Sequence, residues 1–169
     1  MKNTRLVSLT LAALIALLTG AAASAQTKPA ASKPAPEAAF TSEFKKMIAE
    51  YYTAWSTLNP DNAAKYYAKD ADIDFFDVAP LKYKSWSEYR AGVIKAFTEP
   101  MISGKLTPND DLKVKRRGNI AWTTVTFHLS AKPKAGSALE VECRHTAIWE
   151  KRGSKWLIVH EHVSAPLPG

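Results

Sequence analysis

Histidines on strand-like segments in the C-terminal half of the chain are the first candidates for chemistry. His160 and His162 are two residues apart, and a strand would project both from one face together with Trp156 and Ile158. His128, on an earlier strand-like segment, could join them across a sheet. Such histidines can act as acid and base, bind a metal or hydrogen-bond a ligand. The spacing matches no zinc motif, so we expect no metal and no cofactor, and we favour hydrogen bonding in a pocket or at a dimer face.

Acidic, cationic and thiol side chains supply further candidates. Asp74 and Asp77 flank Phe75, and either could act as a general base, which must lie within about 3 Å of the proton that it takes. We favour the alternative that both aspartates are solvated at a strand edge or turn. An inward Arg144 could clamp an anionic substrate, whereas an outward one would pair with a carboxylate on the sheet surface; both alternatives stay open. Cys143 has no identifiable base partner and is interpreted as a packed apolar residue.

Three helices are predicted in the first part of the folded region. Apolar side chains spaced three and four apart from Phe40 to Leu58 predict an amphipathic helix of about five turns. A short helix around Ala64 to Ala68 and a strand from Ala71 to Phe76 follow. Ser85 and Glu88 form a capping box, which predicts a third helix that runs through Phe97.

From Leu106 onward the apolar residues alternate, which predicts strands. The predicted strands are Leu112 to Arg117, Asn119 to Ala131, Leu139 to Glu150 and Lys155 to Ser164. Helices followed by an antiparallel meander are typical of an α+β domain. The long helix must lie in the concave face of the curved sheet, because its apolar stripe needs a sheet to cover it.

The N-terminal segment has the pattern of a secretory signal. Two basic residues precede an apolar run from Leu6 to Leu18, and small residues end in Ala23-Ser24-Ala25. We predict a signal peptide over residues 1–25 and a periplasmic or secreted protein. The run is shorter than the ~20 apolar residues that span a bilayer, so we expect no membrane insertion after signal cleavage.

Composition and charge narrow the class of partner. Residues 26–39 are rich in proline and alanine and predict a flexible tether, which leaves 40–169 as the folded domain. The formal net charge of +7 for 169 residues becomes +4 for that domain. The densest basic cluster runs from Lys113 to Arg117, and we favour a solvated face guarded by charge over a binding patch. We therefore expect no nucleic-acid partner. A single cysteine excludes a disulfide scaffold.

The order of elements resembles the nuclear transport factor 2-like superfamily, and specifically its SnoaL-like branch. Three motifs carry the resemblance. The first consists of Tyr52-Thr53-Ala54-Trp55, Asn59-Pro60-Asp61 and residues 66–72, and the second runs from Ser85 to Arg90. The third runs from Arg144 to Glu150 and continues from Trp156 to Ser164. The resemblance implies a cystatin-like cone in which three N-terminal helices pack in a curved antiparallel sheet. It also implies an apolar cavity that binds small molecules in some members and catalyses isomerisation, dehydration or cyclisation in others, and a homodimer through the outer sheet face.

The chain departs from the ketosteroid isomerase pattern within this superfamily. Tyr52 falls near the position of the family's helix-one tyrosine, but Phe75 stands at the position of the base and Thr146 at that of the second acid. Because two of the three catalytic groups of that enzyme are missing, the resemblance does not imply a typical ketosteroid isomerase. The same comparison directs Thr146 and Arg144 into the cone.

We expect the domain to bind a small, largely apolar molecule in its cone. The predicted ligand-binding residues are Tyr52, Trp55, Phe75, Trp122, His128, Arg144 and Thr146. One alternative is an isomerase or dehydratase that uses His160, His162 or Asp74 for acid–base chemistry. Another is a dimeric interaction module whose seventeen aromatic side chains fill the cone. A void of a few hundred Å³ would favour a ligand.

Overall fold

A computed structural model describes residues 36–78 and 80–167 of the chain. The predicted signal peptide, and the predicted tether as far as residue 35, lie outside these residues. The first helix, α1 (Pro36–Trp55), begins earlier than predicted, so residues 36–39 are helical. Proline is well tolerated in the first turn, where its missing N–H would be unpaired anyway.

The other helical segments are short. Helix α2 (Pro60–Ala63) is capped by Asn59, whose side chain accepts a hydrogen bond from the Asp61 N–H at 3.0 Å. A 3₁₀ turn, Ala64–Tyr66, follows. Helix α3 (Trp86–Val93) continues into a π-helical turn, Ile94–Thr98. The predicted capping box is confirmed, because Ser85 accepts from the Glu88 N–H and the Glu88 carboxylate accepts from the Lys84 N–H.

Six strands form one sheet. They are β1 (Phe75–Phe76), β2 (Met101–Pro108), β3 (Lys113–Arg117), β4 (Ile120–Pro133), β5 (Leu139–Arg152) and β6 (Lys155–Ser164). Their order is β1-β6-β5-β4-β2, and β3 pairs with the first part of β4 while β2 pairs with the second part. All pairs are antiparallel except β1 with β6. Strand β2 was not predicted; it extends the sheet beside the half of β4 that β3 does not reach.

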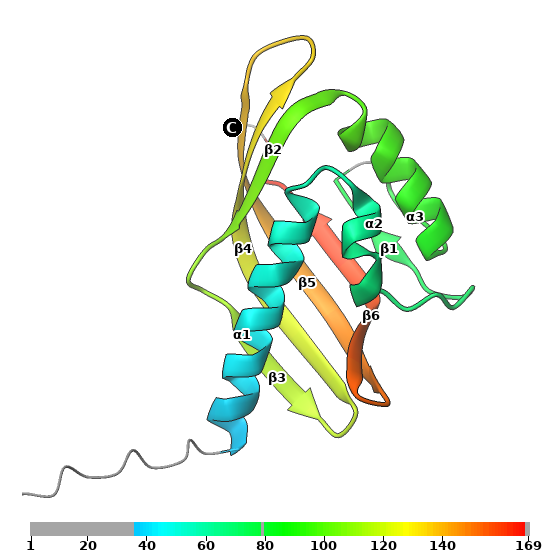
Figure 1. The fold of residues 1–169 in the computed structure, drawn as a ribbon, viewed down its shortest axis with the longest axis vertical. Coiled ribbons are helices and arrows are strands. Elements are labelled where there is room, and N and C mark those ends of the chain that lie inside the picture. The colour runs from blue at the N-terminus through cyan, green and yellow to red at the C-terminus, as the bar shows by residue number, and fades with distance from the viewer. Residues whose placement is uncertain (1–35, 79, 168–169) are drawn as a thin grey trace, which may run out of the picture. The chain divides into compact units, whose positions relative to one another are not determined.

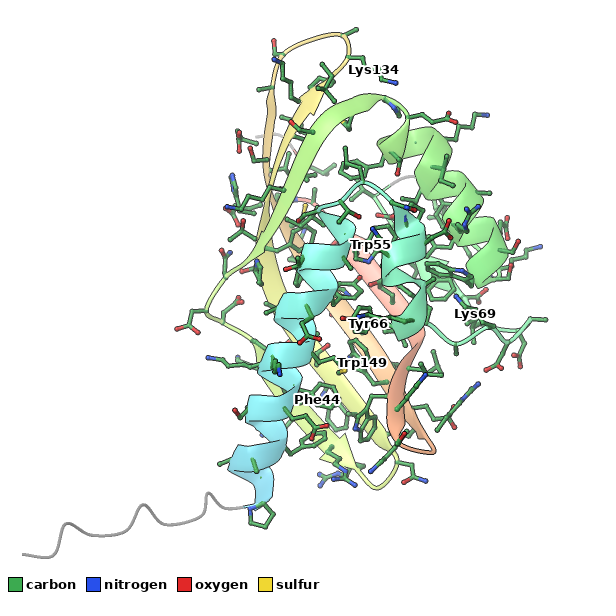
Figure 2. All side chains as sticks on the ribbon, viewed as in Figure 1. Phe44, Trp55, Tyr66, Lys69, Lys134 and Trp149 are labelled. Atoms are coloured by element: carbon green, nitrogen blue, oxygen red, sulfur yellow. The ribbon has the colours of Figure 1, made fainter. Side chains whose placement is uncertain are left out.

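The helices cover one face of the curved sheet, with α1 lying along β4 and β5 (Figure 1). Phe44 on α1 and Trp149 on β5 point toward each other (Figure 2), and their ring centroids are 5.7 Å apart. The core lies between these layers. The predicted α+β class and the placement of the long helix are therefore confirmed. Within 36–78 and 80–167, no helix has the length and apolar character that a membrane crossing requires.

A β-bulge in β6 changes which of its side chains face the helices. Ile148 pairs with His160, but the next residue of β5, Trp149, pairs with Ile158, so Val159 is an extra residue in β6. An inserted residue reverses the alternation of faces along the strand. Trp156 and Ile158 are buried before the bulge, and Glu161 is buried after it.

Candidate functional site

The cone encloses a cavity of about 370 Å³. Its walls come from α1, α3, β2, β4, β5, β6 and the segment after β1, and most of the lining side chains are aromatic or aliphatic. The polar groups that reach it belong to Tyr51, Tyr52, Asp77, Tyr83, Tyr89, Cys143 and His145. An apolar cavity with a few convergent polar groups has the usual design of a small-molecule site.

A buried polar network lies at the side of this cavity. Glu161 on β6 is fully buried, and its carboxylate accepts hydrogen bonds from the hydroxyls of Tyr51 and Tyr67, the latter at 2.8 Å. Nε2 of His145 on β5 lies 2.8 Å from Oε1 of Glu161, a close contact without the geometry of an aligned hydrogen bond. Trp55 completes the network by donating from Nε1 to the Tyr67 hydroxyl at 3.2 Å.

The network keeps Glu161 ionised. Burial alone would raise the pKa of its carboxyl, but the adjacent positive charge of His145 and the hydrogen bonds from Tyr51 and Tyr67 outweigh burial and hold the pKa below its ordinary value. A buried carboxylate is tolerated only when it is paired and hydrogen-bonded. His145 lies beside it, and burial keeps Tyr51 and Tyr67 protonated by raising their pKa values.

Tyr52 connects this network to the cavity. Its hydroxyl lies 2.9 Å from Nδ1 of His145, and its ring contacts Phe127 on β4 with centroids 5.2 Å apart. Either atom of this pair can be the donor, because a hydroxyl and an imidazole nitrogen can each donate or accept. Tyr52 also lines the cavity, so it is in a position to contact a ligand. Glu161, His145 and Tyr52 therefore form a polar chain that ends at the cavity wall.

Asp77 follows β1 and contributes the carboxyl group of the cavity wall. Burial raises its pKa to about 6, although the Val78 N–H, which donates to Oδ1 at 2.7 Å, and a hydrogen bond with Tyr89 act in the opposite direction. A carboxyl group with this pKa exchanges a proton near neutral pH. The expectation that Asp77 is a solvated turn residue is wrong, because the turn after β1 folds it toward the cone.

Two of the predicted ligand-binding residues, Tyr52 and Trp55, line the cavity. Both lie on the buried stripe of α1, which faces the sheet. Phe75 is fully buried but lies behind the wall, where it stacks on Tyr89 with ring centroids 5.0 Å apart. Phe75 therefore supports a lining residue instead of touching the cavity itself.

The other predicted ligand-binding residues lie on the outer face of the sheet, so their inward placement is wrong. Arg144 and Thr146 are exposed, while their neighbours Cys143 and His145 are buried. On β4, Trp122 is 37% exposed, and His128 contacts Glu140 and Glu142 on the outer face at 2.6 and 2.8 Å. Side chains alternate between the two faces of a strand. One wrong choice of the inward face therefore misplaces every residue of that strand.

The predicted catalytic candidates also lie outside the cavity. Nδ1 of His160 donates to the Asp74 carbonyl oxygen at 2.9 Å, and His162 is exposed. The Asp74 carboxylate pairs with Lys82 at 3.1 Å on the surface. The physical reason is the bulge at Val159, which turns the histidines outward and Glu161 inward. Within the described part of the chain, no three His, Cys, Asp or Glu side chains are grouped to hold a metal ion.

The chain belongs to the SnoaL-like domain family, whose profile matches residues 45–168. A comparison with curated proteins finds no match. Among solved structures, it is similar to a nuclear transport factor 2-like superfamily protein from Salmonella enterica serovar Typhimurium LT2, with a TM-score of 0.71 and 18% identity over 78% of this chain and 94% of that one. The predicted superfamily is therefore confirmed.

Two further solved structures extend the comparison. A nuclear transport factor 2-like protein of unknown function from Pseudomonas putida KT2440 has a TM-score of 0.62 and 25% identity over 78% of this chain and 89% of that one. A protein described provisionally as a scytalone dehydratase, from Novosphingobium aromaticivorans DSM 12444, has a TM-score of 0.66 and 7% identity over 78% of this chain and 87% of that one. At such low identity the last likeness concerns the fold alone.

Proposed function

We propose that this protein is exported and that it binds a small, largely apolar molecule in its cone, with a polar group of the ligand directed at Tyr52 and Asp77. The observation that carries the proposal is the cavity of about 370 Å³ with predominantly apolar walls. Small-molecule sites occupy roughly 300 to 1,000 Å³, so the void suits a ligand of two or three fused rings. A cone filled by its own aromatics, the interaction-module alternative, would leave no such void.

The polar groups indicate which ligand atoms the cavity accepts. The hydroxyl of Tyr52, which is 2.9 Å from Nδ1 of His145, can hydrogen-bond an oxygen of the ligand. Asp77 offers a second partner, which donates when protonated and accepts when ionised. A ligand with an apolar body and a carbonyl or hydroxyl group at one end satisfies both residues, since a buried polar group without a partner is costly.

Calorimetric titration with 2-naphthol, a neutral two-ring phenol, tests the proposal. Val141 on β5 lines the cavity, and Val141→Trp should fill part of it and weaken binding at least tenfold. Thr146→Trp places the same side chain on the exposed outer face of the same strand and should leave the affinity unchanged. Wild-type affinity in Val141→Trp, with unchanged thermal unfolding, would contradict the cavity as the binding site.

An acid–base enzyme, of the isomerase or dehydratase type, is the second candidate, and Asp77 is the observation that favours it. A dehydratase needs a base that removes a proton beside a carbonyl and an acid that protonates the departing hydroxyl, so that the products are an enone and water. With its pKa raised to about 6, Asp77 can take the proton as the base and then return it to the departing hydroxyl, which leaves as water. Tyr52 can hold the carbonyl oxygen.

Turnover of a cyclic β-hydroxyketone, followed by the ultraviolet absorbance of the enone, distinguishes the enzyme from the binder. Asp77→Asn should abolish turnover and retain binding of the ketone, whereas Asp74→Asn, outside the cavity, should retain both. Absence of turnover by the wild type with ketones that bind in the cavity would favour the binding function. The export part of the proposal is checked by the N-terminal sequence of the mature chain, which we expect to begin at Gln26.

A further inference from the structure

Two tight turns at one end of the sheet, together with β3, carry seven basic residues. We define the basic end by Lys113, Lys115, Arg116, Arg117, Lys151, Arg152 and Lys155. We propose that the basic end binds the anionic surface of a membrane through the phosphates of its lipids. This surface lies on the two turns, away from the cavity-lining residues, and the proposal does not depend on what the cavity binds.

The two turns lie side by side. Arg117 pairs with Ile120 across the turn between β3 and β4, and Arg152 pairs with Lys155 across the turn between β5 and β6. The backbone N–H of Lys151 donates to the carbonyl oxygen of Asn119 at 2.8 Å, which links the two hairpins directly. Glycines with positive φ, Gly118 and Gly153, close both turns. The two turns hold Arg117, Arg152 and Lys155 at fixed positions at one end of the sheet.

Most of this charge is available to a partner. All seven cationic residues are exposed, and within residues 36–78 and 80–167 Arg152 alone among them forms an ion pair, with Asp70 and Glu150. Elsewhere, Lys45, Lys82 and Arg90 each form an ion pair with an aspartate. The basic end is therefore a local excess of positive charge on a domain whose formal net charge is only +4.

Two aromatic side chains contact the cations of the basic end. The guanidinium of Arg116 lies over the rings of Phe40 and Trp156, 5.1 and 5.6 Å from their centroids, and Nζ of Lys151 is 6.0 Å from the Trp156 centroid. Because cations cover these rings, the rings are not free to stack on nucleic-acid bases, as a single-strand binding platform requires. Ile120, 38% exposed, adds an apolar side chain at the tip of the first turn.

The start of α1 lies at the basic end. Phe40, which Arg116 covers, lies near the start of α1, and Figure 1 shows that α1 begins at the end of the sheet where the two turns lie. The chain therefore enters the domain beside the basic end. Exposed cations, with the exposed apolar side chain of Ile120 at the tip of the first turn, fit the anionic phosphates and the apolar boundary of a lipid surface.

Co-sedimentation with lipid vesicles tests the proposal. The chain from Gln26 is suitable, because residues 36–167 contain the complete hydrophobic core. It should bind vesicles containing phosphatidylglycerol at low salt, lose binding as salt rises, and not bind phosphatidylcholine vesicles. Each cation near an anionic bilayer contributes about fivefold to affinity, so Lys115→Gln, Arg117→Gln and Lys155→Gln together should weaken binding roughly 100-fold.

A control with the same net charge distinguishes a local surface from overall charge. Lys105, Lys132 and Lys134 are exposed and lie toward the opposite end of the sheet, where Figure 2 labels Lys134. Their triple replacement by Gln should weaken vesicle binding less than about threefold. Both triple variants should keep the wild-type thermal unfolding temperature, which shows that neither has lost its fold.

Several results would overturn the proposal. Equal losses in the two triple variants would assign binding to net charge. Failure of the wild type to sediment with phosphatidylglycerol vesicles at low salt would remove the membrane as the partner. Tight binding of a single-stranded RNA, reduced by the triple variant at the basic end, without vesicle binding would assign the surface to nucleic acid instead.

Discussion

Replacement of Glu161 by glutamine tests the buried network most directly. The change preserves the shape of the side chain but removes the negative charge beside His145. It also places an amide NH₂ among hydroxyl donors that now point at carboxylate oxygens. Removing one partner of a buried ion pair typically costs about 3 to 5 kcal/mol. Glu161 and His145 are 0% and 2% exposed, so solvent cannot compensate either group. We expect a loss in this range.

Urea unfolding at pH 7 measures this loss. A domain of this size has about 5 to 15 kcal/mol of stability, so Glu161→Gln should remain folded with a melting temperature roughly 10 to 20 °C lower. Glu142→Gln is the matched control, because Glu142 also contacts a histidine, His128 at 2.8 Å, but on the exposed face. An exposed pair contributes about 0 to 1 kcal/mol, so the control should change little.

The pH dependence gives the reasoning a second test. The pKa of Glu161 is lowered in the folded state, so its contribution to stability is complete above the ordinary value of 4.5 and is lost as pH falls below it. The stability difference between wild type and Glu161→Gln should therefore be constant near pH 7 and shrink below about pH 4.5. A loss no larger than that of Glu142→Gln, or a difference that grows in acid, would refute the ion-pair assignment.

Three further predictions concern the cavity and the outer face. Burial raises the pKa of Asp77 from 3.8 to about 6, so the stability of the wild type should decline as pH rises through this interval and Asp77 ionises. Asp77→Asn should remove this decline in stability, which urea unfolding from about pH 4 to about pH 7 measures. In Gly92→Ala, the added Cβ would lie 2.0 Å from a ring carbon of Tyr83, so calorimetry should show a loss of about 1 to 3 kcal/mol. If copies pair through the outer sheet face, as the family resemblance implies, Trp122→Glu should convert a dimer into a monomer in sedimentation velocity, and an unchanged mass would contradict that interface.

The helices could be predicted because each carries a local signal that tertiary contacts do not override. The apolar stripe of α1 repeats with helical spacing, and the capping box at Ser85 and Glu88 forms as expected. Strand β2 could not be predicted in the same way, because Gly104 and Pro108 interrupt its alternation. Its strand conformation depends on pairing with the second part of β4, which is a non-local contact.

The choice of face on β5 could have been made from local information. Cys143, His145, Ala147 and Trp149 share one face, and Arg144, Thr146 and Ile148 share the other. The first set is the more apolar, so burial favours it, with His145 as the one strongly polar member. The family comparison pointed to the opposite face, and the burial argument proved the better guide. His145 then becomes a buried titratable group that needs a partner of opposite charge.

That partner could not be found by strand alternation. From the buried Trp156 and Ile158, a period of two places His160 and His162 inside and Glu161 outside. The extra residue at Val159 reverses this order and brings Glu161 within 2.8 Å of His145. Without the bulge, His145, which also contacts the Tyr52 hydroxyl, would be buried without a carboxylate beside it. One inserted residue thus determines both the stability of the buried pair and the chemistry of the cavity wall.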